Sequence, residues 1–149
     1  MIKIERTITI HRPVEEVFAY LCDVQHGPNY ISGQREAHKT SSGPMEIGTT
    51  FATSGKFLRR RARYQIVEYE LNHRLAWKAV SGARATTTWD FQPSGPSTRI
   101  TFTRVADPHG LSSLAESLLQ GLANGKIDRD LGALKELLAV TRKAEAKGW

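Results

Sequence analysis

The sequence changes its periodicity once along its length, and this change narrows the folds that it can adopt. From Ile2 to about Ala106, most of the chain consists of short runs rich in β-branched and aromatic residues, separated by turn-forming residues. Beyond that point, leucines recur at three- and four-residue spacing, which is typical of one face of a helix. We therefore expect an antiparallel sheet that is covered by one long helix.

The N-terminal part predicts one strand followed by one or two short helices. Residues 2–10 alternate apolar and polar side chains, as a half-buried strand does, although Arg6 interrupts the apolar face. Pro13 suits the first position of a helix, because its φ is already helical and it has no N–H that needs a partner. The Gly27-Pro28 pair then favours a second short helix or a turn-rich connection.

Five turn-forming runs divide the middle of the chain. They are Ser41-Ser42-Gly43-Pro44, Ser54-Gly55, Leu71-Asn72-His73, Ser81-Gly82 and Pro93-Ser94-Gly95-Pro96. Each of these runs suits a hairpin connection, so we expect about six more strands joined as a meander.

The C-terminal segment predicts one long helix with a single apolar face. That face comprises Leu111, Leu114, Leu118, Leu119, Leu122, Ile127, Leu131, Leu134 and Leu138. The spacing slips by one residue between Leu122 and Ile127, and Asn124-Gly125 lies at the slip, so we expect a kink there. The helix must lie across the concave face of the sheet, and a pocket forms where the two separate.

Three separated segments resemble the polyketide cyclase/dehydrase and lipid-transport family. They are Ile4–Gly33 (IERTITIHRPVEEVFAYLCDVQHGPNYISG), Ile66–Ala79 (IVEYELNHRLAWKA) and Trp89–Thr103 (WDFQPSGPSTRITFT). In that family, a strand leads into a helix of the form Pro-x-Glu-x-Val-Phe, and later hairpins carry Arg-Leu-Ala-Trp and Thr-Arg-Ile-Thr. The chain departs from the family at Tyr30, where a Trp is usual, and at Leu71-Asn72, where the turn usually contains a Pro.

The resemblance implies an α+β START-like (SRPBCC) helix-grip fold, like that of the birch-pollen allergen. A curved antiparallel sheet of about seven strands would wrap around a long C-terminal helix, with one or two short helices between the first two strands. Because the resemblance covers nearly the whole chain, we expect a single ligand-binding domain over residues 1–149. The superfamily includes aromatase/cyclases, lipid and sterol carriers, ubiquinone-binding proteins, hydrolases, plant ligand binders and ribosome-associating toxins, so the fold alone implies only a cavity with a ligand.

We expect the cavity to bind or carry a small hydrophobic molecule, such as a lipid, a polyketide or an aromatic compound. The predicted ligand contacts are Tyr64, Trp77, Arg84, Thr87, Trp89, Phe102, Arg104, Leu118 and Leu122. Aromatic side chains on an inner face can equally fill a core. Arg104 shares a strand face with Phe102, so it either meets an anionic or carbonyl group at the pocket mouth or lies at a solvated strand end.

A cofactor-independent cyclase/dehydratase is the first alternative function. Aldol cyclisation needs a general base and a donor that stabilises the oxyanion. The candidate catalytic residues are His26, Tyr30, Arg104 and His109. Surface loops also carry histidines that have no role, so the residue types alone do not separate an enzyme from a binding protein.

The sequence predicts neither a metal site nor a cofactor. No two of the five histidines have the spacing with which one strand or helix holds a metal, and there is no G-x-S-x-G or G-x-G-x-x-G motif. Cys22, which is the only cysteine, lies on the apolar stripe of the first helix and is expected to pack there as a small hydrophobe.

Basic residues raise a second alternative, which is binding to RNA or anionic lipid. The net charge is +6, and Arg59–Arg63 holds four arginines. Side chains alternate along a strand and no aromatic run accompanies them, so a solvated outer face is favoured and no DNA binding is expected. The long helix could also lie on a membrane surface, with Lys126 on its polar side, but acids such as Asp130 dilute that side.

The composition favours a cytoplasmic protein. A single cysteine excludes an intramolecular disulfide, and the N-terminus lacks the apolar stretch of a signal peptide. No run approaches the ~18 to 20 apolar residues of a membrane span. The sequence leaves open whether the protein is a monomer or a homodimer.

Overall fold

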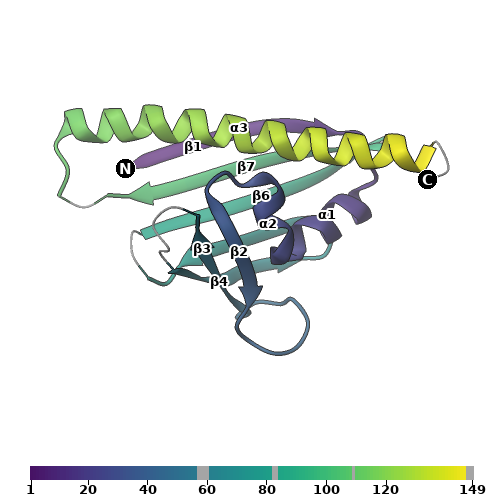
Figure 1. The fold of residues 1–149 in the computed structure, drawn as a ribbon, viewed down its shortest axis with the longest axis horizontal. Helices are drawn as coiled ribbons and strands as arrows, with labels where there is room; N and C mark the ends of the chain where they lie inside the picture. Colours follow the sequence, from purple (N-terminus) through teal and green to yellow (C-terminus); the bar gives the residue numbers. More distant parts are fainter. Residues whose placement is uncertain (57–60, 82–83, 109, 147–149) are drawn as a thin grey trace.

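The computed structural model describes residues 1–56, 61–81, 84–108 and 110–146, and it places a curved antiparallel sheet beside one long helix (Figure 1). The elements in chain order are β1 (Ile2–Ile10), α1 (Val14–Cys22), the 3-10 helix η1 (Val24–His26), α2 (Gly27–Tyr30), β2 (Gln34–Lys39), β3 (Thr50–Gly55), β4 (Arg61–Glu70), β5 (Arg74–Ala79), β6 (Arg84–Ser94), β7 (Ser97–Asp107) and α3 (Ser113–Ala146). The described strands form one sheet in the order β1-β7-β6-β5-β4-β3-β2. The helix-grip prediction is therefore confirmed.

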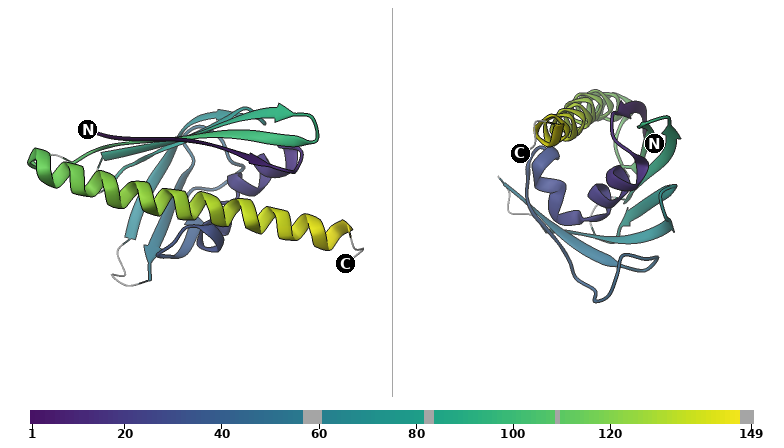
Figure 2. Two further views of the ribbon diagram at one scale, coloured as in Figure 1. Left: turned by 90° about the horizontal axis from the view of Figure 1, so that it is seen from above. Right: turned by 90° about the vertical axis from the view of Figure 1, so that its right-hand side faces the viewer.

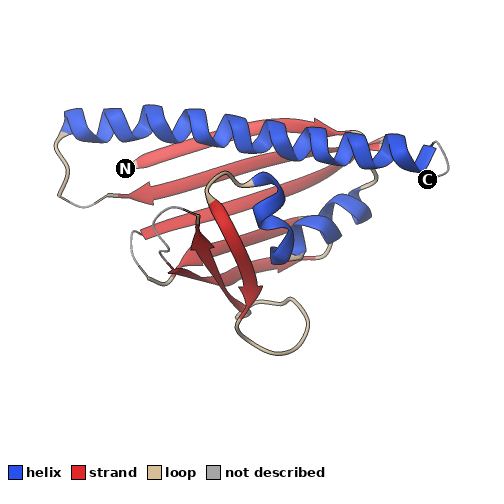
Figure 3. Cartoon of the chain, viewed as in Figure 1, coloured by secondary structure: helices blue, strands red, loops and turns tan. Residues whose placement is uncertain are grey.

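The sheet is a meander except that its first strand closes against its last. Each pair of neighbouring strands is antiparallel, and β1 pairs along its whole length with β7. The end-on view in Figure 2 shows the sheet curving round so that the helices close its open side. Figure 3 shows the short helices against one face of the sheet and α3 running beside β1.

The break in the apolar face of β1 is a point of attachment to α3. The isoleucines of β1 pack into the core, with Ile4 and Ile10 almost fully buried. Arg6, at the break, donates from Nε to Oδ1 of Asp128 at 2.7 Å and from Nη2 to Oδ1 of Asn124 at 3.4 Å. A charged residue in the middle of this strand thus ties the edge of the sheet to the helix.

Helix α1 packs into the core through its predicted stripe. Phe18 makes edge-to-face contacts with Phe91 at 5.1 Å and with Tyr69 at 5.6 Å between ring centroids. The helix begins at Val14, one residue later than predicted, and Pro13 is its N-cap, with a φ of −61° and an extended ψ of 150°. Cys22 is half-buried, and burial raises the pKa of its thiol to about 12.

Helix α3 corrects one prediction about the long helix. It continues through Asn124 and Gly125 without a break, so the expected kink there is wrong. Its second half packs into the core through Ile127, Leu131, Leu134 and Leu138. The earlier leucines at positions 114, 118 and 122 are exposed, and the leucine at position 111 is exposed just before the helix begins. Because no kink absorbs the slip in spacing, a regular helix carries Leu114, Leu118 and Leu122 to its outer side, while Leu119 stays on the side of the sheet.

Candidate functional site

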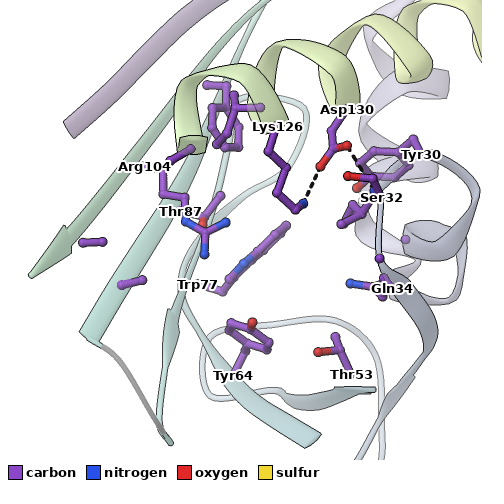
Figure 4. Close-up of a pocket in the computed structure, with 18 of the residues that line it drawn as sticks. Tyr30, Ser32, Gln34, Thr53, Tyr64, Trp77, Thr87, Arg104, Lys126 and Asp130 are labelled. Atoms are coloured by element: carbon purple, nitrogen blue, oxygen red, sulfur yellow. Dashed lines mark hydrogen bonds and ion pairs between the residues drawn. The ribbon is translucent and has the colours of Figure 1, made fainter. Parts of the chain in front are cut away.

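A cavity of about 550 Å³ lies between the concave face of the sheet, the α1–α2 segment and α3. Figure 4 shows polar side chains converging on it from several elements. Its apolar wall includes Ile2, Ile4, Leu21, Phe51, Trp77, Trp89, Phe102, Leu119, Ala123, Ile127 and Leu131. The wall is thus mostly apolar, with a few polar groups, which is the usual composition of a site for a small molecule.

A continuous row of aromatic rings forms the floor of this cavity. Trp89 packs edge-to-face on Phe102 at 4.8 Å and lies 6.3 Å from Trp77. Phe51 then contacts Trp77 at 5.5 Å and stacks on Tyr64 at 5.0 Å. The row crosses five adjacent strands because strand pairing places these residues at neighbouring positions on one face of the sheet, as in the Trp89–Phe102 and Phe51–Tyr64 pairs.

An ion pair on α3 lies at the cavity wall. Lys126 Nζ donates to Oδ2 of Asp130 at 2.6 Å, and Oδ1 of the same carboxylate accepts from the backbone N–H of Ser32 at 3.0 Å. The Asp130 side chain is only 13% exposed. The structure thus places Lys126, which the membrane-surface alternative assigned to the polar side of the helix, at the cavity wall, because residues 126 and 130 share the side of α3 that carries Ile127.

A second cation enters the cavity from the sheet. Arg104 on β7 pairs in register with Thr87 on β6, and both line the cavity. Arg104 is half-buried, and the described part of the chain offers its guanidinium no hydrogen-bond or ion-pair partner. In Figure 4 it approaches from the wall that carries Trp77, with Lys126 reaching into the same space from above. The arginine is therefore available to an anionic or carbonyl oxygen.

Tyr30 and Gln34 form the wall nearest the short helices. Burial raises the pKa of Tyr30 above its ordinary value, and the nearby Tyr20 and Asp130 raise it further, so the phenol stays protonated and remains a hydrogen-bond donor. Oε1 of Gln34 lies so close to Gly27 that a Cβ at that position would overlap it. Among the described residues, neither this Oε1 nor Nε1 of Trp89 has a hydrogen-bond partner, although both atoms are buried.

The cavity brings together most of the residues that the sequence singled out. Those that line it are Tyr30, Tyr64, Trp77, Thr87, Trp89, Phe102 and Arg104. Whether they touch a ligand stays a prediction.

The other predicted residues lie elsewhere. His26 stacks on Tyr20 with ring centroids 4.0 Å apart, and its Nδ1 lies 2.9 Å from the backbone oxygen of that residue. Arg84 is exposed at the start of β6 and is not part of the wall. Leu118 and Leu122 are exposed on the outer side of α3, so their assignment to the cavity is wrong. His109 lies outside the described residues.

Sequence analysis placed Leu119, Ile127 and Leu131 on the apolar face of the long helix but missed Ala123, Lys126 and Asp130, which lie on the same side of α3 at the cavity. Together these six residues form the face of α3 that meets the cavity. In a regular helix, Lys126 and Asp130 lie one turn apart and next to Ile127 and Leu131. This spacing therefore predicts that the ion pair lies beside the apolar residues that face the cavity.

The described residues contain no group of three or more His, Cys, Asp or Glu side chains that could hold a metal ion. Within the same residues, no helix has the length and apolar character needed to cross a membrane.

Comparison with known proteins identifies the family. The family model described as polyketide cyclase / dehydrase and lipid transport matches residues 1–139. The chain belongs to this family. No curated protein matches this chain.

Solved structures share the fold of this family member at low sequence identity. Protein TTHA0849 from Thermus thermophilus is 18% identical, with a TM-score of 0.75 over 93% of this chain and 98% of that one. A START superfamily protein from Mycobacterium smegmatis is 10% identical, with a TM-score of 0.74 over the same shares. The di-domain ARO/CYC protein BexL of the BE-7585A biosynthetic pathway is 14% identical, with a TM-score of 0.76 over 91% of this chain and 46% of BexL.

Proposed function

We propose that this protein binds a small, largely apolar molecule in the cavity between its sheet and α3. The observation that carries the proposal is the cavity itself, whose volume of about 550 Å³ falls within the range of ~300 to 1,000 Å³ that small-molecule sites occupy. The continuous aromatic row offers a flat apolar surface, which suits a ring system or a folded chain.

The polar side chains of the cavity would orient the ligand. Its apolar body would lie against Trp77 and Trp89, and its polar group would face Arg104 and the Lys126–Asp130 pair. A guanidinium that has no partner among the described residues, in a half-buried wall, favours a carboxylate, an enolate or a carbonyl oxygen, because charge-assisted hydrogen bonds are stronger where water is scarce.

Native mass spectrometry of the protein purified from its own cells tests the proposal. A compound of small mass held at one copy per chain and released by denaturation is the expected result. Ala123→Phe would fill the cavity from α3 and should abolish the bound mass. Ala115→Phe is the matched control, since Ala115 lies two turns earlier on the same helix and outside the cavity wall.

A wild-type protein that is empty and is not stabilised by any of a panel of lipids, polyketides and quinones would contradict the proposal. Carriage would show as transfer of the compound between vesicles.

A cyclase/dehydratase is the second candidate, and one observation favours it. The carboxylate of Asp130 and the protonated phenol of Tyr30 meet at the same wall, close enough for the Asp130 charge to raise the pKa of Tyr30. In this scheme, Asp130 takes a proton from carbon, Arg104 stabilises the enolate oxygen, and Tyr30 donates a hydrogen bond. Turnover of a β-keto substrate that is lost in Asp130→Asn would support this role, and binding without turnover would leave the carrier function.

The basic strand remains a separate prediction. Arg61 and Arg63 at the start of β4 are both exposed, whereas Arg59 and Arg60 lie outside the described residues. Binding to RNA or anionic vesicles through this strand would weaken steeply with added salt.

A further inference from the structure

The outer side of α3 carries an apolar face that the ligand cavity does not explain. Leu114, Leu118 and Leu122 are 72%, 64% and 73% exposed. Gly121 and Gly125 lie on the same side, and nothing comes within 4 Å of the Cβ position of either glycine. We call these five residues the leucine–glycine face.

This face is directed away from the rest of the protein. Leu118 precedes the buried Ile127 by nine residues, which is two and a half turns and places the two side chains on opposite sides of the helix. Leu122 has the same relation to the buried Leu131. Figures 1 and 2 show α3 along the outer edge of the fold, so a second molecule could reach this face without meeting the sheet.

No charge needs to be removed from water to cover the face. The helix has no charged side chain between Glu116 and Lys126. Glu116 is paired with the amino group of Met1, and Lys126 is paired with Asp130 on the cavity side. The main cost of burying charged groups in an interface is therefore absent along this stretch.

Among the described residues, no neighbour within one copy of the chain requires glycine at position 121 or 125. Alanine would fit at Gly121 and Gly125 and would favour the helix, because glycine is among the poorest helix formers. Glycine on an exposed helix face instead allows a second backbone to approach closely.

The leucine–glycine faces of two copies of the chain are complementary to each other. Leu114, Leu118, Gly121 and Gly125 are separated by four, three and four residues, which is the seam spacing of paired helices. When a second α3 runs antiparallel, Leu114 of one copy comes opposite Gly125 of the other, and Leu118 comes opposite Gly121. Each leucine side chain then packs over a glycine of the other copy, where there is no side chain to exclude it. The same contacts repeat about a two-fold axis.

We propose that two copies of this chain form an antiparallel dimer through the leucine–glycine face of α3. The face spans about 18 Å of helix, which is shorter than an interface of the standard size needs, so the dimer should be weak, with a Kd of about 1 to 100 μM. A membrane surface fits the face less well, since such surfaces gain from bulky apolar residues flanked by Lys and Arg rather than from glycines.

Sedimentation velocity over a concentration series tests the proposal. Wild-type protein should shift from monomer to dimer, and Leu118→Glu should remain a monomer. The matched control is Leu71→Glu, because Leu71 is also 64% exposed but lies in the turn between β4 and β5, outside the leucine–glycine face. A wild-type protein that stays monomeric over the whole series would overturn the dimer, as would a Leu118→Glu protein that dimerises like wild type.

A glycine substitution gives a second readout that a folding defect cannot imitate. Gly121→Ala should raise the melting temperature of the dilute monomer by about 2 to 6 °C while raising the dimer Kd at least tenfold. Gly132→Ala is the control, because Gly132 is equally open but lies beyond the face, so it should raise the melting temperature and leave the Kd unchanged. Equal Kd values for the two variants would overturn the proposal. So would a monomeric wild type that binds phosphatidylcholine vesicles through Leu118, since a membrane would then be the partner.

Discussion

Lys126 Nζ lies 2.6 Å from Oδ2 of Asp130 on the side of α3 that faces the cavity. The pair also joins α3 to the segment after α2, because the other carboxylate oxygen accepts from the N–H of Ser32. The ion pair thus holds one wall of the cavity in place and puts both charges beside the space that the proposed ligand would occupy.

Asp130→Asn should lower stability and change ligand preference together. The amide still accepts from Ser32 but leaves Lys126 without its anion, which should cost about 1 kcal/mol of unfolding free energy because the lysine is partly exposed. The released ammonium should make the cavity bind anionic probes more tightly. Urea unfolding and titration with 2-naphthoate measure the two effects. Asp128→Asn, which breaks the exposed pair with Arg6, serves as the control and should leave probe affinity unchanged.

Arg104→Gln should weaken binding of anionic ligands selectively. The loss of a charge-assisted hydrogen bond in a half-buried wall should reduce affinity for 2-naphthoate about 5- to 30-fold and change affinity for 2-naphthalenemethanol little. Arg84→Gln removes an exposed arginine outside the wall and should affect neither probe. Quenching of tryptophan fluorescence reports both affinities, and equal losses for the two probes would exclude a charge-specific role.

The two faces of α3 should respond very differently to the same substitution. Leu134 is 0% exposed and Leu122 is 73% exposed. Leu134→Ala should therefore cost about 2 to 5 kcal/mol of unfolding free energy, and Leu122→Ala less than about 0.5 kcal/mol. Chemical denaturation of dilute protein compares them, and a large loss in Leu122→Ala would mean that α3 is rotated relative to the sheet.

Burial of Cys22 and Tyr30 should make stability fall in alkaline solution. Both groups have a raised pKa in the folded protein, with Cys22 moving from 9.0 to about 12. Above pH 9, the unfolded thiol loses its proton while the folded one keeps it, so each rise in pH favours unfolding until the folded pKa is reached. Thermal melts from pH 8 to pH 11 should fall less steeply for Cys22→Ala than for wild type. Identical slopes would show that the folded thiol ionises normally.

Local patterns in the sequence are enough to predict the order and type of the helices and strands. Alternation from Ile2 to Ile10 predicts β1, turn-forming runs separate the later strands, and leucine spacing predicts α3, because these signals depend on neighbours close along the chain. Alternation also groups Phe102 with Arg104 on one strand face, and both line the cavity, but alternation alone leaves open which face turns inward.

The side of α3 that meets the cavity depends instead on long-range packing. A helix has no fixed pair of faces, and the slip in spacing at Asn124-Gly125 allowed either a kink or a regular helix. The regular helix agrees with the packing of Ile127 and Leu131 in the core and with the attachment of α3 to β1 through Arg6. Such contacts, of which Arg6–Asp128 joins residues 122 positions apart, lie beyond the reach of a local sequence pattern. They bring Lys126 and Asp130 to the cavity and carry the earlier leucines to the outside.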